Sequence, residues 1–342
     1  MTAHHTRWWA WLALFLAPTF IPGVAAAETI VKLTLDYAFE GPSAPFLLPL
    51  DKGYYKAEGL NVSISPGTNS IEPIARVASG EYDFGFGDIN SLIKLRDANR
   101  NTPVKAIFVL YNRPPFAVIG RRSRGVNSPK DLEGKTLGAP AADGAYAQWP
   151  IFVKVNGIDA SKVKIENVGF AVREPMLAAG QVDAITGYSF TAYIDLKDKG
   201  VPVTDINVML MADYGVELYG NAILVNSKFA DENPEAVRGF LRAFLRGLHE
   251  TVRHPAAGVE AVLRHNANAS KSVELERLNM AIRENIITHE TKANGYGAVN
   301  EDRFARALDQ IALAYKFKSG KPKLEDIFDD SFLPDEAARR VK

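Results

Sequence analysis

A short repeat constrains the fold of this chain more than any other feature of its sequence. Segments 78–87 and 179–187 align so that three residues recur with the same spacing: Gly80 with Gly180, Asp83 with Asp183, and Gly87 with Gly187. Each copy follows a helical run and leads into an apolar strand that ends at a glycine, where backbone can approach a ligand. The repeat predicts two similar α/β lobes. We expect its aspartates to serve turns, a common role of this residue, and the loops 87–91 and 187–193 to face a ligand.

The segment 33–67 predicts the start of the first lobe. Apolar residues 33–35 are expected to form a strand that delivers the loop 36–45, rich in glycine and proline, to the open end of a sheet. A helix at 46–58 and an alternating strand at 61–65 are expected to follow. Open α/β sheets bind ligands at this place, so the loop is a candidate binding element.

Charge and cysteine content exclude several classes of function. The 342-residue chain is long enough for two lobes with cores of their own. Its 40 basic and 40 acidic residues leave no basic footprint of the kind that nucleic-acid-binding proteins show. The sequence contains no cysteine, which excludes disulfides, thiol nucleophiles, cysteine-ligated zinc and a lipidated cysteine anchor. We therefore expect no nucleic-acid partner.

The N-terminal segment 1–27 is typical of a cleaved secretory signal peptide. A weakly basic stretch at 4–7 precedes an apolar run at 8–20, and three alanines at 25–27 offer a cleavage site. The alternative is a membrane anchor, but the apolar run is shorter than the roughly 20 residues that span a bilayer. The sequence therefore predicts a periplasmic protein that is not anchored to the membrane.

Two connections are expected to join the lobes. A double proline separates the strands expected at 105–110 and 116–120, which places a first hinge near 111–116. A second hinge is expected near 212–220. We therefore expect a discontinuous division of the chain: lobe 1 at 28–113 plus 219–316, lobe 2 at 114–218, and a C-terminal tail at 317–342.

The C-terminal third is predicted to be helical. Apolar residues between Val237 and Val252 recur at helical spacing, which indicates a helix that packs one face on a core. Further helices are expected at 255–265, 273–288 and 301–315. The prolines and charges of the tail indicate that it is loosely held.

Three segments resemble a known family. Residues 51–62 resemble the "GYF…EGL…V" signature of periplasmic solute-binding proteins of ABC importers, and the branch they resemble most is the NMT1/THI5-like group, which includes nitrate, sulfonate and taurine binders. Residues 128–138 are similar to a "DLKGKTVG"-like segment of the family, and residues 213–219 resemble the return crossover of its pyrimidine-binding branch. The resemblance covers residues 29–316.

This resemblance implies a fold and a role. The fold is α/β of the type II periplasmic binding protein kind, with two Rossmann-like lobes joined by two crossover segments. The role is that of the substrate-binding component of an ABC importer, which captures a small molecule between its lobes and delivers it to a permease. The partners implied are that small-molecule ligand and the transmembrane subunits of the permease.

Catalytic and metal-binding motifs are missing from the sequence. Gly134-Lys135-Thr136 fails as a phosphate-binding loop, because the motif requires glycine where Pro129 stands. No two histidines of segment 28–342 have the helical spacing of a zinc pair. The pyrimidine synthases of the family use a cysteine-rich motif, which this chain cannot supply. We therefore expect no catalytic residue, no metal and no cofactor, and a binding protein rather than an enzyme.

The candidate ligand-binding residues are aromatic and polar side chains at expected strand ends and loops. Aromatic rings can sandwich a flat ligand, and carboxylates or amides can accept its N–H groups. The candidates are Asp36, Tyr37, Phe39, Glu40, Ser43, Asp88, Asn90, Tyr111, Asp143, Tyr146, Arg173, Tyr188, Phe190 and Tyr214.

The chemistry of the ligand stays open from the sequence alone. Arg173 could clamp an anionic group bidentately, or it could be a surface arginine before a helix. The pyrimidine branch usually begins "LDW-x-PN-x-x-H", whereas here Tyr37 replaces the tryptophan and the asparagine and histidine are missing. An aromatic or heterocyclic solute, of the pyrimidine or thiamine-precursor kind, is the first expectation. The alternatives are an anionic solute, such as an aromatic carboxylate, an alkanesulfonate or taurine, and a secreted enzyme or a sensor on the same fold.

Overall fold

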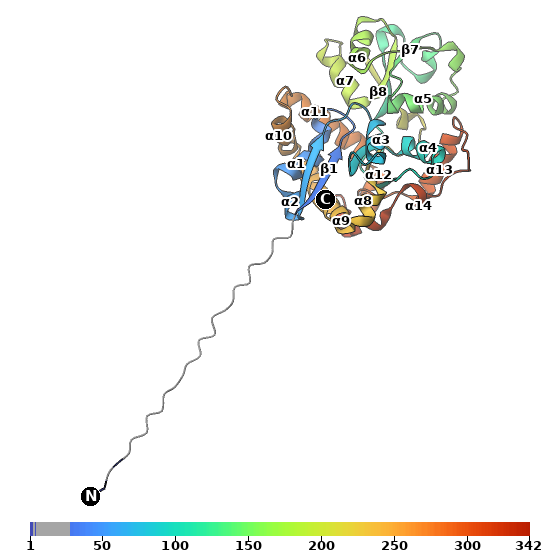
Figure 1. Ribbon diagram of the computed structural model, residues 1–342. Coiled ribbons are helices and arrows are strands. Elements are labelled where there is room, and N and C mark those ends of the chain that lie inside the picture. Colours follow the sequence, from blue (N-terminus) through green and yellow to red (C-terminus); the bar gives the residue numbers. More distant parts are fainter. Residues whose placement is uncertain (3, 5–27) are drawn as a thin grey trace.

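The computed structural model describes residues 1, 2, 4 and 28–342. The expected signal peptide therefore lies almost wholly outside the described residues. The described chain forms two five-stranded sheets, each covered by helices. In Figure 1 the second lobe, in green, stands apart from a first lobe built of blue, cyan, orange and red segments. Over residues 28–342, none of the helices has the length and apolar character needed to cross a membrane.

The first sheet has the strand order β2-β1-β3-β10-β4. Strand β1 runs parallel to β2 and β3, whereas β10 runs antiparallel to its neighbours β3 and β4. The strand bounds are β1 Thr29–Thr34, β2 Leu60–Ser65, β3 Phe84–Asp88, β4 Val104–Val109 and β10 Asn221–Asn226.

The second sheet repeats this arrangement, with the order β7-β6-β8-β5-β9. Its antiparallel strand is β5, which lies between β8 and β9. The strand bounds are β5 Phe116–Arg121, β6 Thr136–Ala139, β7 Lys164–Asn167, β8 Ala184–Tyr188 and β9 Ile206–Leu210. In both sheets, the antiparallel strand is the first one that the chain forms after it crosses from the other sheet.

The two crossovers, 110–115 and 211–220, lie side by side. The Gly220 N–H donates to the Tyr111 carbonyl at 2.9 Å, and the Tyr111 N–H donates to the Asn221 carbonyl at 3.1 Å. A Cβ at position 220 would lie 2.9 Å from the Cα of Pro114, so a side chain there would force the crossovers apart. The two connections between the lobes are therefore joined to each other by backbone hydrogen bonds and close packing.

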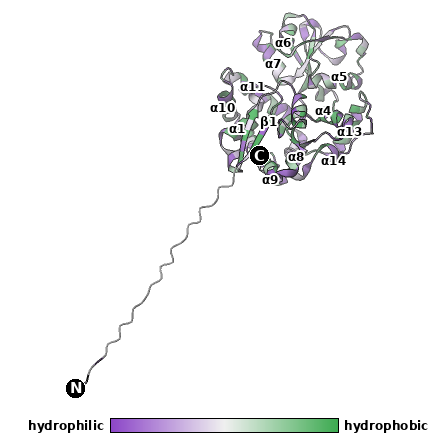
Figure 2. Cartoon of the chain, in the orientation of Figure 1, coloured by the Kyte–Doolittle hydropathy of each residue, from purple (hydrophilic) through white to green (hydrophobic). Residues whose placement is uncertain are grey.

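Helices cover both sheets, and each helix buries one of its faces. Those of the second lobe are α5 Gly144–Val155, α6 Phe170–Ala179 and α7 Ser189–Asp198. Those of the first lobe are α1 Ala44–Asp51, α2 Tyr54–Ala57, α3 Glu72–Ala78, α4 Ile89–Ala98, α8 Ser227–Glu232, α9 Pro234–Arg253, α10 Pro255–His265, α11 Lys271–Ala281, α12 His289–Asn294, α13 Glu301–Ala312, α14 Leu324–Ile327 and α15 Glu336–Arg339. The predicted apolar face of α9 is buried, with Phe240 stacked on Phe84 at 4.3 Å between ring centroids. Figure 2 shows hydrophilic and hydrophobic residues together on outer helices such as α9.

Several sequence expectations need correction. The helix expected at 46–58 is divided into α1 and α2, because Gly53 adopts a left-handed conformation with φ 68°. Strand β1 begins earlier than the expected 33–35 and ends at Thr34. The helix expected at 273–288 changes to a π-helix at Ile282–Ile286, which ends before Thr288.

The C-terminal segment 317–342 is packed rather than loosely held. Ile327 is fully buried and Phe328 is 5% exposed, beside strand β4. The Arg339 guanidinium donates to the carbonyls of Tyr296 at 2.9 Å and Pro334 at 2.8 Å. This segment therefore packs on the first lobe, because its apolar and arginine side chains have partners there.

Candidate functional site

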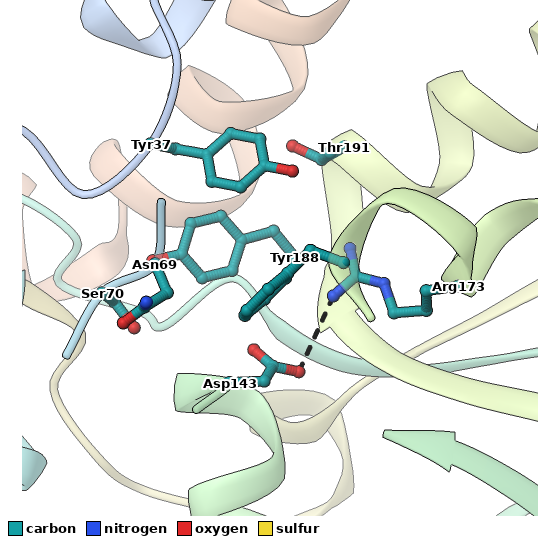
Figure 3. A pocket seen from close by; sticks show the side chains of 8 residues that line it. Tyr37, Asn69, Ser70, Asp143, Arg173, Tyr188 and Thr191 are labelled. Carbon is teal, nitrogen blue, oxygen red and sulfur yellow. Dashed lines mark ion pairs between the residues drawn. The ribbon is translucent and has the colours of Figure 1, made fainter. Parts of the chain in front are cut away.

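Two adjoining hollows lie where the lobes face each other. Each leaves a free volume of only about 20 Å³ in this structure. Tyr37, Tyr188 and Thr191 line both, so the hollows are two parts of one cleft. Figure 3 shows the side chains of Tyr37 and Tyr188 close to each other in the first hollow, with Asn69 and Ser70 to one side.

The lining comes from loops that follow parallel strands. Residues 35–43 follow β1, Asn69 and Ser70 follow β2, Asp143 follows β6, and Tyr188 ends β8. The carboxyl ends of parallel strands meet at one edge of a sheet, which is where open α/β sheets bind ligands. Each lobe therefore presents its binding edge to the other.

Tyr188 links the lobes through a buried polar cluster. Its hydroxyl donates to Asp36 Oδ2 at 3.1 Å, and Asn221 Nδ2 lies 2.8 Å from the same carboxylate oxygen and 3.0 Å from the Tyr188 hydroxyl. Asp36 is only 8% exposed. Burial raises the pKa of Asp36 to about 7, despite the hydrogen bonds that favour the carboxylate. The Asp36 carboxyl can therefore accept a hydrogen bond or, when protonated, donate one near neutral pH.

A second polar cluster surrounds Glu40, which lines the second hollow together with Asp36. Arg277 on α11 donates to Glu40 Oε2 at 2.9 Å and to Asp195 Oδ1 on α7 at 3.3 Å. Burial raises the pKa of Glu40 to about 8, although the Arg277 guanidinium acts in the opposite direction. Since Asp195 belongs to the second lobe, Arg277 also bridges the lobes.

Arg173 is buried within the second lobe and is already paired. Its Nε donates to Glu174 Oε1 at 2.8 Å, and its Nη1 lies 3.8 Å from Asp143 Oδ2, the ion pair dashed in Figure 3. The guanidinium lies against Gly187, where an added Cβ would be 2.9 Å from its Cζ. Arg173 is 4% exposed, so the alternative of a surface arginine is wrong.

Most of the sequence candidates lie around this cleft. The lining includes Asp36, Tyr37, Glu40, Ser43, Tyr111, Asp143, Arg173, Tyr188 and Phe190. Ser43 bonds within its own loop, since its hydroxyl donates to the Ala38 carbonyl at 3.3 Å. Asp143 caps α5 and accepts from the Thr186 hydroxyl at 2.7 Å.

The structure places the other five candidates outside both hollows. Asp88 caps α4 by accepting from the N–H groups of Asn90 and Ser91, and the Asn90 amide donates to the Tyr219 carbonyl at 2.7 Å. Phe39 packs edge-on against His265, and Tyr214 packs edge-on against Phe152. Tyr146 packs at the edge of an apolar cluster that includes β5 and α5.

In the first hollow, four lining residues were not among the sequence candidates: Asn69, Ser70, Phe170 and Thr191. Ser70 and Phe170 stand 100 positions apart, the offset of the sequence repeat, so extending that alignment toward the N-terminus would have found both. Asn69 precedes α3 and accepts from the Ile71 N–H at 2.9 Å, as an asparagine before a helix commonly does. Thr191 lies within the segment 187–193 that the repeat had indicated, although this segment is the end of β8 and the start of α7 rather than the expected loop.

Metal binding has no support in the described part of the chain. Across it, no three histidine, aspartate or glutamate side chains gather in a way that could hold an ion.

Comparison with known proteins gives the cleft its context. The chain is 30% identical to the riboflavin-binding protein RibY of Chloroflexus aurantiacus over 70% of its own length and 68% of that protein. It is 28% identical to the formylaminopyrimidine-binding protein of Halalkalibacterium halodurans over 75% of its own length and 78% of that protein. Other relatives, 24 to 26% identical, are named 4-amino-5-hydroxymethyl-2-methylpyrimidine phosphate synthase.

The fold and the family model agree with these relatives. The periplasmic aliphatic sulphonate binding protein SsuA of Escherichia coli matches with a TM-score of 0.69 and 13% identity, over 87% of this chain and 91% of that one. The expected two-lobed fold of periplasmic binding proteins is therefore confirmed. The family model described as "NMT1/THI5 like" matches residues 42–258. The chain therefore belongs to the NMT1/THI5-like family.

Proposed function

We propose that this protein is the periplasmic substrate-binding component of an ABC importer, and that it captures a small aromatic or heterocyclic solute between its lobes and delivers it to a permease. The observation that carries the proposal is the Tyr188–Asp36–Asn221 cluster, in which side chains of both lobes meet beside the Tyr37 ring. A solute bound there would contact both lobes at once. Hinge closure around a ligand is an established switching mode of two-lobed proteins.

The charges of the cleft favour a nitrogen heterocycle over an anion. Asp36 and Glu40 line one hollow, and Asp143 lines the other. Arg173, the arginine that lines the cleft, already pairs with Glu174 and Asp143. An anionic solute would therefore meet carboxyl groups and a neutralised guanidinium, whereas ring N–H or amino groups would meet acceptors. The relatives named for riboflavin and formylaminopyrimidine bind flat nitrogen heterocycles.

A thermal-shift screen tests this function. The probes are riboflavin, 4-amino-5-hydroxymethyl-2-methylpyrimidine and taurine, each added to the chain purified without its N-terminal 27 residues. A solute at a hundredfold excess over its Kd stabilises the folded state by about 2.7 kcal/mol. We expect a shift with a heterocycle and none with taurine. A shift with taurine alone would instead support the anionic alternative, and mass spectrometry of solute carried through mild purification would identify a natural ligand.

Two substitutions connect the shift to the cleft. Tyr37→Ala and Tyr188→Ala should each abolish the shift, because they remove a ring and, at Tyr188, the link to Asp36. Ser319→Ala, on the far C-terminal segment, is the control and should leave it unchanged. Loss of binding in the control as well would point away from the cleft.

An enzyme is the second candidate, because some relatives are named as synthases. The cysteine-rich motif expected of such synthases is missing from this chain, whose sequence has no cysteine. Incubation with a solute that shifts the melting temperature, followed by mass spectrometry, separates the two. Recovery of the solute unchanged supports binding, and a product of different mass supports catalysis.

A further inference from the structure

One arginine of the first lobe holds both crossovers. Arg303, on α13, donates through Nη2 to the backbone carbonyls of Asn112 at 2.7 Å and Leu218 at 2.8 Å. Its Nη1 donates to Asn112 Oδ1 at 3.0 Å. Asn112 belongs to the first crossover and Leu218 to the second, so a single guanidinium joins the two connections. The same group lies 4.0 Å from the centre of the Tyr219 ring, which adds a cation–π contact.

Neighbouring residues fix the same backbone from the other side. The Arg113 N–H donates to the carbonyl of Asn285 at 3.1 Å, and the Asn285 amide donates back to the Arg113 carbonyl at 3.1 Å. Asn285 lies in the final turn of a helix, where backbone carbonyls lack a partner within the helix. The Arg113 N–H of the crossover is the donor that the Asn285 carbonyl would otherwise lack. The Thr288 hydroxyl donates to Asn112 Oδ1 at 2.7 Å.

Glu290 completes the network and balances its charge. It accepts from the Tyr219 hydroxyl at 2.6 Å and from the Asn112 amide at 3.1 Å. It also pairs with Arg303 at 3.0 Å. Each charged group of the network thus has an opposite partner, and the Arg303 and Glu290 side chains are 13% and 20% exposed. Partly buried, doubly bonded contacts of this kind hold backbone far more firmly than exposed ion pairs do.

This anchoring leaves little chain free to bend. The first crossover is held as far as Arg113, so only Pro114 and Pro115 separate the anchor from β5, and each proline fixes its own φ. The second crossover is held from Gly215 to Leu218, because Gln310 on α13 bonds the Gly215 carbonyl and the Glu217 N–H, which leaves 211–214 between β9 and the anchor. Any rotation of the second lobe must therefore occur within these two short segments.

We propose that Arg303 is a positioning residue that fixes the axis about which the lobes close, and so sets how Tyr188 meets Asp36, although it does not line the cleft. The inference rests on the proposed function in one respect, namely that lobe closure is the motion that captures a solute. The distribution of lobe orientations in the unliganded protein is then narrow because of Arg303. Removing the guanidinium takes away the one side chain that bonds the backbone of both crossovers, while bonds such as Asn285 to Arg113 and Gln310 to Gly215 remain.

Pulsed electron–electron spin resonance on the unliganded protein tests this directly. The natural chain has no cysteine. Lys56→Cys on α2 and Lys164→Cys on β7 would place one spin label on each lobe, since these side chains are 79% and 70% exposed. We expect Arg303→Met to broaden the distribution of label distances by about twofold or more, because lobe rotation is then less restricted. Arg242→Met is the matched control, since Arg242 pairs with Glu58 at 2.8 Å in the first lobe, away from both crossovers.

Two milder variants keep the test decisive if Arg303→Met does not fold. Arg303→Lys keeps a positive charge but loses the planar fork whose two terminal nitrogens reach the carbonyls and Asn112 Oδ1, and Thr288→Val removes one bond to Asn112 together with the cap of α12. Each should broaden the distribution less than Arg303→Met. Distributions as narrow as the unsubstituted protein in both would overturn the proposal. Since no solute is present, failure to find a ligand would count against the proposed function and leave this result standing.

Discussion

The two lobes share a scaffold but use equivalent positions differently. Asp83 and Asp183 play the same part in each sheet: Asp83 accepts from the Lys32 N–H at 2.8 Å, and Asp183 accepts from the Thr136 N–H at 2.9 Å. Each aspartate thus joins the start of its strand to the neighbouring parallel strand. This confirms the scaffold role predicted for the pair.

Five residues further on, the lobes diverge. Asp88 caps its own helix, α4, and accepts from the Gln148 amide on α5 at 3.3 Å, whereas Tyr188 makes no side-chain cap for α7 and reaches Asp36 in the other lobe. A similar contrast holds beneath the strands, where Pro73 packs on Gly87 and Arg173 packs on Gly187. Of these four residues, Tyr188 and Arg173 line the cleft, whereas Asp88 and Pro73 do not. A binding site can therefore be built from a repeat by changing a few strand-end residues while the backbone stays the same.

The largest expected effect tests whether Arg173 differs from its counterpart Pro73. Arg173→Met would leave Glu174 and Asp143 buried without their partner, which typically costs about 3–5 kcal/mol. Pro73→Ala should cost much less, since it removes only apolar packing. Urea unfolding measures both, and equal losses would contradict the distinction between the two positions.

The pH dependence of stability should come chiefly from the first lobe's side of the cleft. The pKa of Asp36 is raised from 3.8 to about 7, so the folded state binds more protons than the unfolded state between these values. The free energy of unfolding should therefore fall as pH rises from about 4 to about 7, by a few kcal/mol at most. Asp36→Asn should make this slope less steep, with Glu40 still contributing because its pKa is also raised, while Asp309→Asn on the surface should not change it. An unchanged slope in Asp36→Asn would contradict the raised pKa.

The strand-end residues offer an intermediate effect. Asp88→Ala removes a helix cap and should lower stability by about 1–2 kcal/mol while leaving the thermal shift by a heterocycle intact. Tyr188→Phe should do the reverse, since it removes the hydroxyl that contacts Asp36 but no cap. Parallel melting curves with and without solute measure both. Loss of solute binding in Asp88→Ala would show that the two lobes are less specialised than their contacts indicate.

The smallest effect is expected at the exposed contact between the lobes. Lys197 on α7 pairs with Glu276 on α11 at 2.6 Å, and both side chains are well exposed. Exposed ion pairs contribute little to stability. Lys197→Met should therefore leave the melting temperature within the scatter of repeated measurements, whereas Arg277→Met, at the buried bridge nearby, should lower it. A similar fall in melting temperature in both variants would contradict the expected difference between the buried and the exposed ion pair.

Sequence reasoning found the architecture better than the individual contacts. The repeat and the strand patterns sufficed for two lobes, because hydrophobic alternation and glycine spacing are local signals. The sequence could not predict that Asp88 caps a helix while Tyr188 lines the cleft, because both residues end a strand and only the direction of the side chain differs. Asn221 and Arg277 were missed for another reason: the crossover and a distant helix bring them to Asp36 and Glu40, and no local pattern records that.

The central place of β10 in the first sheet affects the order in which the molecule can assemble. Strands β3 and β4 both pair with β10 and not with each other. A nascent chain that has not yet reached Asn221 therefore holds two strand edges without their shared neighbour, although every strand of the second sheet is already made. Unpaired edges favour association with other chains. The nascent first lobe thus depends on a late-arriving strand, and synthesis must outpace aggregation until that strand emerges.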